Sequence, residues 1–475
     1  MSVPIGRLFA VIVVMFALLV FFTTRWTVID AASLNNNHLN RLTLVSQLRI
    51  KRGKILASDG TVLARSVPAG GRTWKRVYPT GSLFAQAVGY SNLTEGSAAG
   101  LELSDGPDLR GLQTGLSSIF GQLSSNRVGD DVYTTLDARG QRAAMQALGG
   151  QDGSVVALNP RNGAVLVMYS NPSYNNNGAN PCGKGAVGSC FNRATQASYA
   201  PGSTFKIVTA SAALDSGLYT PNSTINGNSP ITVSGVPLAN DGGQSWGFQS
   251  LTTALTFSIN TIFAQVAERV GRGRMADYMK RFGFYSLPPL DYPPTEMRAS
   301  DVIGFNGKAI PPGSPQEDIG RIGIGQGGLS VTPLQMAMVA AAVANGGKLM
   351  TPHLTARVVN SAGATVKTIS PSVYSQVMSA TAAHELTQMM TKVVEEGTGT
   401  AVQLTGISVA GKTGTASIGP TGANLTEPSF VAFAPAENPR VAIDVTVDRS
   451  QGGFGGTVAA PIAKAVLQTL LAEGR

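Results

Sequence analysis

The chain of 475 residues is longer than most single domains, so we expect at least two domains. Its apolar fraction of 43% and charged fraction of 13% indicate a globular protein with a large core and exclude disorder as the dominant state. The net charge of +9 comes from dispersed lysines and arginines. Because the sequence has no basic stripe interleaved with aromatic residues, we predict no nucleic-acid partner.

Near the N-terminus, residues 8–24 carry no charge, and their length is at the short end for a membrane span. A cleaved signal peptide is the alternative, although Ile29-Asp-Ala31 is a poor cleavage site. We favour an uncleaved anchor because the uncharged stretch is longer than most signal-peptide cores. We therefore predict a cytoplasmic tail over residues 1–7, a transmembrane signal-anchor over residues 8–24, and a catalytic domain outside the cytoplasm.

After the anchor, a polar connector leads to two short apolar runs around Asp59-Gly60, which predict a β-hairpin. The sequence up to Asp130 is then rich in glycine, serine and polar turns. We interpret residues 25–130 as a small non-catalytic module. The pattern changes at Tyr133, after which the apolar spacing predicts a helix over residues 135–148.

The rest of the chain predicts one large domain over residues 131–475. Two buried-type strands flank Asn162-Gly163. Helices are predicted over residues 205–214, 250–270, 273–282, 333–345, 382–396 and 460–473, and later strands over residues 406–417, 429–433 and 440–447. Because the strands come from both ends of the domain and most helices from its middle, we predict an α+β (mixed) fold with one sheet.

The chain has two cysteines, Cys182 and Cys190, close together in a stretch rich in glycine and asparagine. In an oxidising compartment they can close a small loop, so we predict a disulfide, with two unlinked thiols as the alternative. Their spacing does not fit a zinc knuckle, and the three histidines are scattered. We predict no metal site.

A glycine-rich segment over residues 323–328 matches a dinucleotide-binding fingerprint by its letters. No βαβ pattern surrounds it, and Lys348 lies about where the fingerprint needs an acid. We interpret the segment as a tight loop before a helix that Thr332 caps and Pro333 begins. No cofactor is predicted.

The first candidate for chemistry is Ser203, which follows Pro201-Gly202 and stands at the start of an apolar helix. Lys206 is three positions on, so its amine lies on the same helical face within reach of the serine hydroxyl. Burial and the positive end of the helix dipole would keep this amine partly neutral and so activate the serine. A solvated helix start would have the same pattern, so the motif does not establish catalysis alone.

Two further motifs follow in order. Ser258-Ile-Asn260 lies inside the helix predicted over residues 250–270, where both polar residues would equally suit a solvated face. Lys412-Thr413-Gly414-Thr415 lies on a predicted strand, where Lys412 and Gly414 share one face and the two threonines share the other. Gly414 has no side chain to block a bound peptide. Four stretches match Ser-x-Asn, so only the order of the three motifs makes this one informative.

Together, Ser-x-x-Lys, Ser-x-Asn and Lys-Thr-Gly resemble the signature of penicillin-binding proteins and serine β-lactamases, and their flanking residues look like class B penicillin-binding proteins. Arg52-Gly-Lys-Ile55 is similar to the juxtamembrane motif of that class, although Ala57 and Ser58 stand where an Asp-Arg pair is usual. The short region before the catalytic domain is similar to that of an actinobacterial branch of the class. The resemblance implies a transpeptidase domain with a central antiparallel sheet.

The resemblance also implies a role for each residue of the first two motifs. Ser203 would attack the carbonyl of a terminal D-Ala-D-Ala peptide and form an acyl-enzyme, and Lys206 would take its proton. Ser258 would relay a proton to the leaving D-Ala amine. Asn260 would hold the substrate amide and orient Lys206.

In the third motif, Lys412 would supply positive charge, and the hydroxyls of Thr413 and Thr415 would receive the substrate carboxylate beside Gly414. The backbone N–H groups of Ser203 and Thr415 would form the oxyanion hole.

The implied function is that of a peptidoglycan D,D-transpeptidase, which cross-links stem peptides of the cell wall and binds β-lactam antibiotics covalently. Expected partners are the lipid-linked peptidoglycan precursor, the membrane, and machinery of cell division or elongation. One alternative is a β-lactamase or D,D-carboxypeptidase, against which stands the long sequence before Ser203 and the lack of a clear deacylating glutamate. Another is a non-catalytic penicillin sensor or division scaffold.

Overall fold

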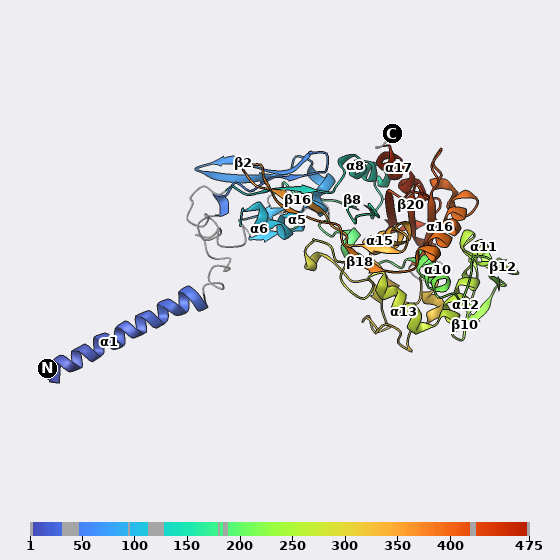
Figure 1. Ribbon diagram of the computed structural model, residues 1–475, viewed down its shortest axis with the longest axis horizontal. Helices are drawn as coiled ribbons and strands as arrows, with labels where there is room; N and C mark the ends of the chain where they lie inside the picture. The colour runs from blue at the N-terminus through green and yellow to red at the C-terminus, as the bar shows by residue number, and fades with distance from the viewer. Residues whose placement is uncertain are drawn as a thin grey trace.

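The computed structural model describes residues 3–30, 47–93, 96–112, 128–178, 181–183, 189–418 and 424–472. Figure 1 shows three parts in chain order: an N-terminal helix, a β-rich module, and a larger domain whose sheet has helices on both faces. This division places the three candidate motifs in the larger domain.

The N-terminal helix α1 (Val3–Thr24) continues into a π-helical turn (Arg25–Ile29). The segment Val3–Thr27 has a mean hydropathy of 2.7, and no residue of α1 is buried. By length and composition the helix can cross a membrane. The helix spans the whole of the predicted membrane segment over residues 8–24 and begins five residues before it, at Val3.

The module is built on a six-stranded sheet in which β1 (Ile55–Leu56) and β2 (Val62–Gly70) pair antiparallel. This pairing confirms the hairpin predicted around Asp59-Gly60. The sheet order is β17-β16-β6-β1-β2-β3, and its other strands are β3 (Thr73–Val77), β6 (Asp131–Thr134), β16 (Thr355–Val359) and β17 (Thr365–Thr368). No strand was predicted for β16 and β17, which come from far along the chain and complete the sheet of the module.

Short elements fill the rest of the module. They are η2 (Gly81–Phe84), α4 (Ala85–Val88), β4 (Ser91–Asn92), β5 (Ser97–Ala98), α5 (Gly100–Ser104) and α6 (Gly106–Leu109).

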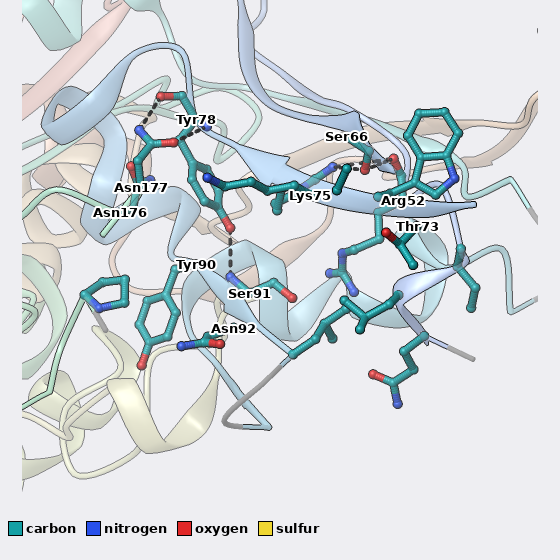
Figure 2. Close-up of a pocket in the computed structure, with 18 of the residues that line it drawn as sticks. Arg52, Ser66, Thr73, Lys75, Tyr78, Tyr90, Ser91, Asn92, Asn176 and Asn177 are labelled. Atoms are coloured by element: carbon teal, nitrogen blue, oxygen red, sulfur yellow. Dashed lines mark hydrogen bonds between the residues drawn. The ribbon is translucent and has the colours of Figure 1, made fainter. Parts of the chain in front are cut away.

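Tyr78 and Asn177 join the module to the larger domain (Figure 2). The Tyr78 N–H donates to Asn177 Oδ1, and Asn177 Nδ2 donates to the Tyr78 carbonyl, both at 2.9 Å. The Tyr78 hydroxyl accepts from the Ser91 N–H at 2.7 Å. Just beyond Asn177, Cys182 and Cys190 are joined by a disulfide. One asparagine amide thus uses both its donor and its acceptor to hold the two parts together.

The larger domain has a central antiparallel sheet in the order β19-β20-β21-β7-β8. Its strands are β7 (Gly153–Leu158), β8 (Val165–Asn171), β19 (Ala410–Ile418), β20 (Leu425–Ala434) and β21 (Val441–Val447), and the short β22 (Ser450–Gln451) pairs with β20. The prediction of a mixed fold with strands from both ends of the domain is confirmed. Strand β19, which carries the Lys-Thr-Gly motif, lies at the edge of this sheet.

Both faces of the sheet are covered because its side chains alternate between two clusters. Val155 packs on one face in a cluster with α8 (Ala138–Leu148) and α17 (Ala459–Leu471). The next residue, Val156, packs on the other face in the cluster that contains α15 (Pro333–Ala344). The sheet is therefore the middle layer of three.

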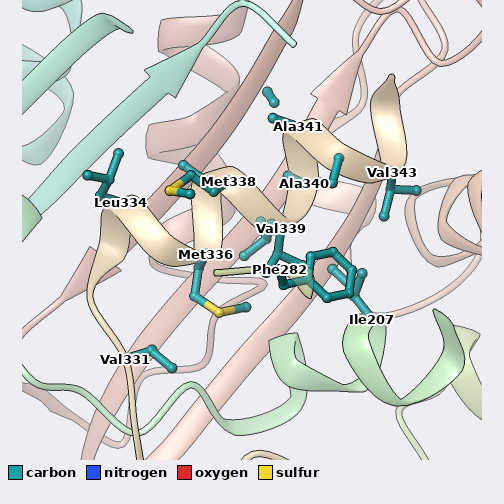
Figure 3. Packing of buried hydrophobic residues seen from close by; sticks show 14 of the residues in the cluster. Ile207, Phe282, Val331, Leu334, Met336, Met338, Val339, Ala340, Ala341 and Val343 are labelled. Atoms are coloured by element: carbon teal, nitrogen blue, oxygen red, sulfur yellow. The ribbon is translucent and has the colours of Figure 1, made fainter. Parts of the chain in front are cut away.

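Helix α15 is buried from Pro333 through Val343. Figure 3 shows Ile207 and Phe282 close to its side chains. The Thr332 hydroxyl accepts from the Gln335 N–H at 3.2 Å, which confirms the predicted cap. Because α15 is buried on all sides and apolar apart from Gln335, it acts as a core helix between the sheet and the helices that carry the candidate site.

The other α-helices of the described residues are α9 (Arg193–Gln196), α10 (Lys206–Asp215), α11 (Leu251–Thr256), α12 (Asn260–Val270), α13 (Arg272–Arg281), α14 (Ile319–Ile322) and α16 (Ala380–Glu395). Small strand pairs are β9 (Thr224–Asn226) with β12 (Phe248–Ser250), β10 (Ile231–Val233) with β11 (Val236–Leu238), β13 (Asp301–Val302) with β14 (Leu329–Ser330), and β15 (Lys348–Met350) with β18 (Val373–Gln376).

The continuous helix predicted over residues 250–270 is wrong. The chain leaves the helix after Thr256, and Ser258 has a φ of +60°, which no helix interior accommodates. The Ile259 N–H returns to the Ala254 carbonyl at 2.9 Å and closes the end of α11. Apolar periodicity continues across this break and no glycine or proline marks it, so the sequence pattern does not reveal it.

Candidate active site

Ser203 lies in a short 3-10 turn, η3 (Gly202–Phe205), which leads directly into α10. The helix was predicted to begin at the serine, but this tighter turn comes first. Ser203 is half-buried, and its hydroxyl makes no hydrogen bond to any residue that the structure describes. The nucleophile candidate is therefore accessible, while the residues around it are fixed by backbone contacts.

One of those contacts comes from the predicted tight loop at residues 323–328. The Gly202 N–H donates to the Gly325 carbonyl at 3.1 Å. A Cβ on Gly325 would lie 1.8 Å from the Gly202 oxygen, and Gly325 has a φ of +80°. Only glycine meets both requirements. The loop thus supports the turn that presents Ser203.

Strand β19 supports the same turn from another side. A Cβ on Gly414 would lie 2.6 Å from the Pro201 oxygen, so the strand and the turn approach each other closely at this glycine. A Cβ on Gly202 would lie 3.2 Å from the backbone nitrogen of Thr415. The Ser203 turn and the Thr415 backbone are therefore neighbours, as an oxyanion hole made from both would need.

Lys206 is completely buried and donates hydrogen bonds to the break between α11 and α12. Its Nζ lies 2.7 Å from the Ser258 carbonyl oxygen, 3.2 Å from Ser258 Oγ and 2.7 Å from Asn260 Oδ1. Burial lowers the pKa of Lys206 well below its usual range, and the positive charge of Lys412 lowers it further. The site therefore favours the neutral amine, which is the form that can accept a proton.

Lys412 is also completely buried, on β19. Its Nζ donates to Ser258 Oγ at 3.0 Å, to the Thr413 carbonyl at 3.0 Å and to Thr413 Oγ1 at 3.3 Å. Burial lowers the pKa of Lys412 to about 7. Two lysines from different elements thus contact one hydroxyl, that of Ser258.

The positive φ of Ser258 makes this convergence possible. In a continuous helix, Ser258 and Asn260 would project about 200° apart, since each residue advances by about 100°. The break instead brings the Ser258 hydroxyl and the Asn260 amide to the same ammonium group. The structure therefore unites Lys206, Ser258, Asn260 and Lys412 in one hydrogen-bonded cluster.

Sequence reasoning missed three residues of the site. Thr398 Oγ1 lies 2.7 Å from Thr413 Oγ1, and the Gly455 N–H donates to Thr415 Oγ1 at 3.1 Å. Asp241 is the carboxylate whose charge acts on Lys206, where it opposes the lowering of the pKa. The only sequence signal for Thr398 is a glycine on each side, between a predicted helix and a predicted strand.

The described residues contain no candidate metal site. Among them, no group of three histidine, cysteine, aspartate or glutamate side chains could hold a metal ion. The predicted contact between the Lys206 amine and the Ser203 hydroxyl is not a hydrogen bond in the described residues, because this amine bonds to Ser258 and Asn260 instead. The chemistry that the site offers is nucleophilic, with an accessible serine, an amine that favours its neutral form and a second amine for an anion.

Comparison with known proteins identifies the class to which this fold and site belong. Residues 153–468 match the penicillin binding protein transpeptidase domain, and residues 52–131 match the penicillin binding protein A dimerisation domain. The chain therefore belongs to the penicillin-binding protein family.

The similarity extends to individual members. The chain is 32% identical to peptidoglycan D,D-transpeptidase PbpA of Mycobacterium tuberculosis over 99% of both chains. It is 31% identical to stage V sporulation protein D of Bacillus subtilis, over 84% of this chain and 64% of that protein. The ceftriaxone acyl-enzyme structure of penicillin-binding protein A from M. tuberculosis superposes with a TM-score of 0.79 at 32% identity, over 90% of this chain and 100% of that one. The predicted resemblance to class B proteins, and within them to actinobacterial penicillin-binding protein A, is confirmed.

Proposed function

We propose that this chain is a membrane-anchored peptidoglycan D,D-transpeptidase with Ser203 as its nucleophile. The observation that carries the proposal is the convergence of Lys206 and Lys412 on Ser258 Oγ, in a buried cluster assembled from three separate segments. Membership of the penicillin-binding protein family, and relatives that are named D,D-transpeptidases, support it.

In the first half-reaction, Ser203 Oγ attacks the carbonyl carbon of the penultimate D-Ala, and the bond to the terminal D-Ala nitrogen breaks. Lys206, kept neutral by burial, accepts the hydroxyl proton. Ser258 Oγ lies between the two amines and can pass a proton to the leaving D-Ala nitrogen. Asn260 holds the amine of Lys206 in place through its side-chain oxygen.

The third motif binds the substrate. A bound carboxylate would favour the charged form of Lys412 and so raise its pKa above about 7. The hydroxyls of Thr413 and Thr415 hydrogen-bond this carboxylate, with Gly414 leaving room for the peptide. The N–H groups of Ser203 and Thr415 stabilise the tetrahedral oxyanion, and each such donor contributes roughly 10²–10³ in rate.

In the second half-reaction, an amine of another stem peptide attacks the acyl-enzyme. A new C–N bond forms, the ester bond to Ser203 breaks, and the serine oxygen regains a proton. A β-lactam carbonyl reacts with Ser203 in the same way, and opening of its ring gives a covalent adduct.

The cellular setting follows from the anchor. Helix α1 is long and apolar enough to hold the protein in the membrane, next to a lipid-linked precursor. We infer that the catalytic domain lies outside the cytoplasm, where peptidoglycan is cross-linked, and that proteins of cell division or elongation are its partners.

The proposal is tested by incubating the full chain with a labelled penicillin and measuring the mass of the intact protein. We expect one long-lived adduct that maps to Ser203 and is absent from Ser203→Ala. No adduct on the native protein, or an adduct that survives the substitution, contradicts the proposal. Rapid turnover of penicillin would favour a hydrolase instead. Full restoration of cross-linking by Ser203→Ala in a depleted strain would favour a scaffold.

A further inference from the structure

Thr398 is an exposed residue at the edge of the catalytic cluster, in the turn after α16. Its hydroxyl lies 2.7 Å from Thr413 Oγ1, and Thr413 is buried with 7% of its surface exposed. Thr413 Oγ1 in turn accepts from Lys412 Nζ at 3.3 Å. Thr398 is thus one hydrogen bond away from the residues to which the proposed function assigns carboxylate binding.

The backbone of Thr398 is fixed on two sides. Its N–H donates to the Thr256 carbonyl at 3.3 Å, at the last residue of α11 and two residues before Ser258. A Cβ on Gly456 would lie 2.4 Å from the Thr398 oxygen, so this glycine lets the turn at residues 453–457 approach closely. The adjacent Gly455 N–H reaches Thr415 Oγ1. Thr398 therefore contacts the end of α11, strand β19, and the turn whose Gly455 N–H reaches Thr415.

The hydrogen bonds that Thr413 Oγ1 can make indicate a role for the Thr398 hydroxyl. The charged form of Lys412, which the proposed function requires for carboxylate binding, can only donate, so Thr413 Oγ1 accepts from it and the hydrogen of Thr413 needs an acceptor of its own. Thr398 Oγ1, at 2.7 Å, can serve as that acceptor, and either of the two oxygens can be the donor in this hydrogen bond. When a carboxylate binds, Thr413 turns its hydrogen to the ligand, and the Thr398 hydroxyl can donate to the remaining lone pair of Thr413. Thr413 is then fully hydrogen-bonded in both states.

We propose that Thr398 is a positioning residue of the carboxylate subsite, which orients the Thr413 hydroxyl toward the substrate and holds β19 against the end of α11. This inference rests on the proposed function, because it concerns the same site. It predicts that removal of the Thr398 hydroxyl impairs ligands that bear a carboxylate and spares ligands that lack one.

The test compares Thr398→Val, which keeps the shape but loses the hydroxyl, with Thr398→Ser, which keeps the hydroxyl. Thr400→Val is the matched control, since it removes an exposed threonine hydroxyl two residues away that makes no hydrogen bond in the described structure. The probes are benzylpenicillin and its methyl ester, and the measurement is the second-order rate of Ser203 acylation in the full chain. We expect Thr398→Val to slow acylation by benzylpenicillin about tenfold, as for one lost hydrogen bond, and to change the rate with the ester little.

We expect Thr398→Ser and Thr400→Val to keep the preference of the wild type for the free carboxylate. An unchanged preference in Thr398→Val overturns the inference. Equal slowing with both probes also overturns it, because that result indicates a purely structural role. The rate with the ester reports whether the variant is folded. Absence of any Ser203 adduct on the wild type would instead count against the proposed function.

Discussion

Lys206 and Lys412 share one hydroxyl neighbour. Burial disfavours the charged form of both amines, and the charge of Lys412 further lowers the pKa of Lys206. In the function that we propose, the two lysines have different roles. One amine, that of Lys206, favours its neutral form because of burial and the nearby charge of Lys412, while an asparagine oxygen and a backbone carbonyl hold it in place. The other lies beside two threonine oxygens at the strand edge, where a substrate carboxylate would restore its charge.

A bell-shaped pH profile of acylation follows from this pair. The base must be neutral, so the rate rises with pH as Lys206 loses its proton. The anion-binding amine must be charged, so the rate falls as Lys412 loses its proton, with an apparent pKa of about 7 in the free enzyme. The second-order rate of acylation by benzylpenicillin between pH 5 and 10 measures both limbs. A rate that rises steadily to pH 10 would contradict the role of Lys412.

The Asn260 side chain is expected to control the protonation of Lys206. In Asn260→Asp, a carboxylate replaces the amide 2.7 Å from the amine, and its negative charge raises the pKa of Lys206. We expect acylation at pH 7 to fall by roughly 10–10³-fold and to recover as the pH is raised. Asn260→Ala is the control, because it removes the contact without adding a charge and so should show less recovery. Equal pH profiles for the two variants would count against this account.

At the scale of elements, backbone contacts position the site more than side-chain chemistry does. The loop at Gly325 and the strand at Gly414 both meet the short turn of Ser203 at distances that only glycine permits. The break between α11 and α12 then aims Ser258 and Asn260 at Lys206. These contacts explain why the proposed catalytic residues, which are far apart in sequence, can form one cluster.

Gly325→Ala is expected to displace the Ser203 turn. Its Cβ would clash with the Gly202 oxygen, in addition to the strain of its φ of +80°. Gly235→Ala is the matched control, since Gly235 has a φ of +78° and nothing within 4 Å of the added carbon. We expect the control to lose about 1–3 kcal/mol of unfolding free energy and keep its acylation rate, and Gly325→Ala to lose more stability and most acylation. Chemical denaturation and acylation kinetics measure the two effects, and equal behaviour would refute the argument.

Some elements were predictable from local sequence patterns, and others were not. The Asp59-Gly60 hairpin and the cap at Thr332 were predictable because local turn and cap chemistry determines them. The break at Ser258 was not, because Ser258 has no local reason to leave the helix. Its conformation is stabilised by the contacts of Lys206 and Lys412, which come from distant segments.

At the scale of the whole molecule, the module and the catalytic domain share structure. Strand β16 of the later chain pairs with β6 in the sheet of the module. Close to this junction, Asp105 is buried, and its Oδ2 accepts from Thr355 Oγ1 at 2.8 Å. Burial raises the pKa of Asp105 to about 7. The junction therefore contains a carboxyl group that favours its protonated form.

Asp105→Asn is expected to stabilise the junction more at high pH than at low pH. The pKa of Asp105 is higher in the folded state than in the unfolded state. The unfolding free energy of the wild type therefore falls as the pH rises from about 4 to about 7, and above that range the loss is complete. We expect the gain in unfolding free energy to be larger at pH 8.5 than at pH 5.5 by about 2 kcal/mol. Thermal or denaturant unfolding of wild type and variant at the two pH values measures the difference, and an equal gain would show that Asp105 does not titrate in this range.

Removal of residues 1–30 is expected to separate anchoring from chemistry. Helix α1 has no buried residue, so its loss exposes no core. We expect the truncated chain to leave the membrane fraction and to keep its rate of Ser203 acylation by penicillin. Fractionation followed by labelling measures both. A truncated chain that stays in the membrane fraction, or that no longer reacts, would contradict this division.

By itself, the sequence determined the motifs, their order, the apolar N-terminal segment and most of the elements, because periodicity, turn residues and caps are local properties. It pointed to Ser203 and its lysine as a candidate, and the order of the three motifs gave the class. Only the tertiary structure decided which groups touch. Lys206 bonds to Ser258 and Asn260, Thr398 joins Thr413, and a late hairpin completes the sheet of the module. These contacts link segments far apart in the chain, and their geometry depends on the packing of the whole domain rather than on any local pattern.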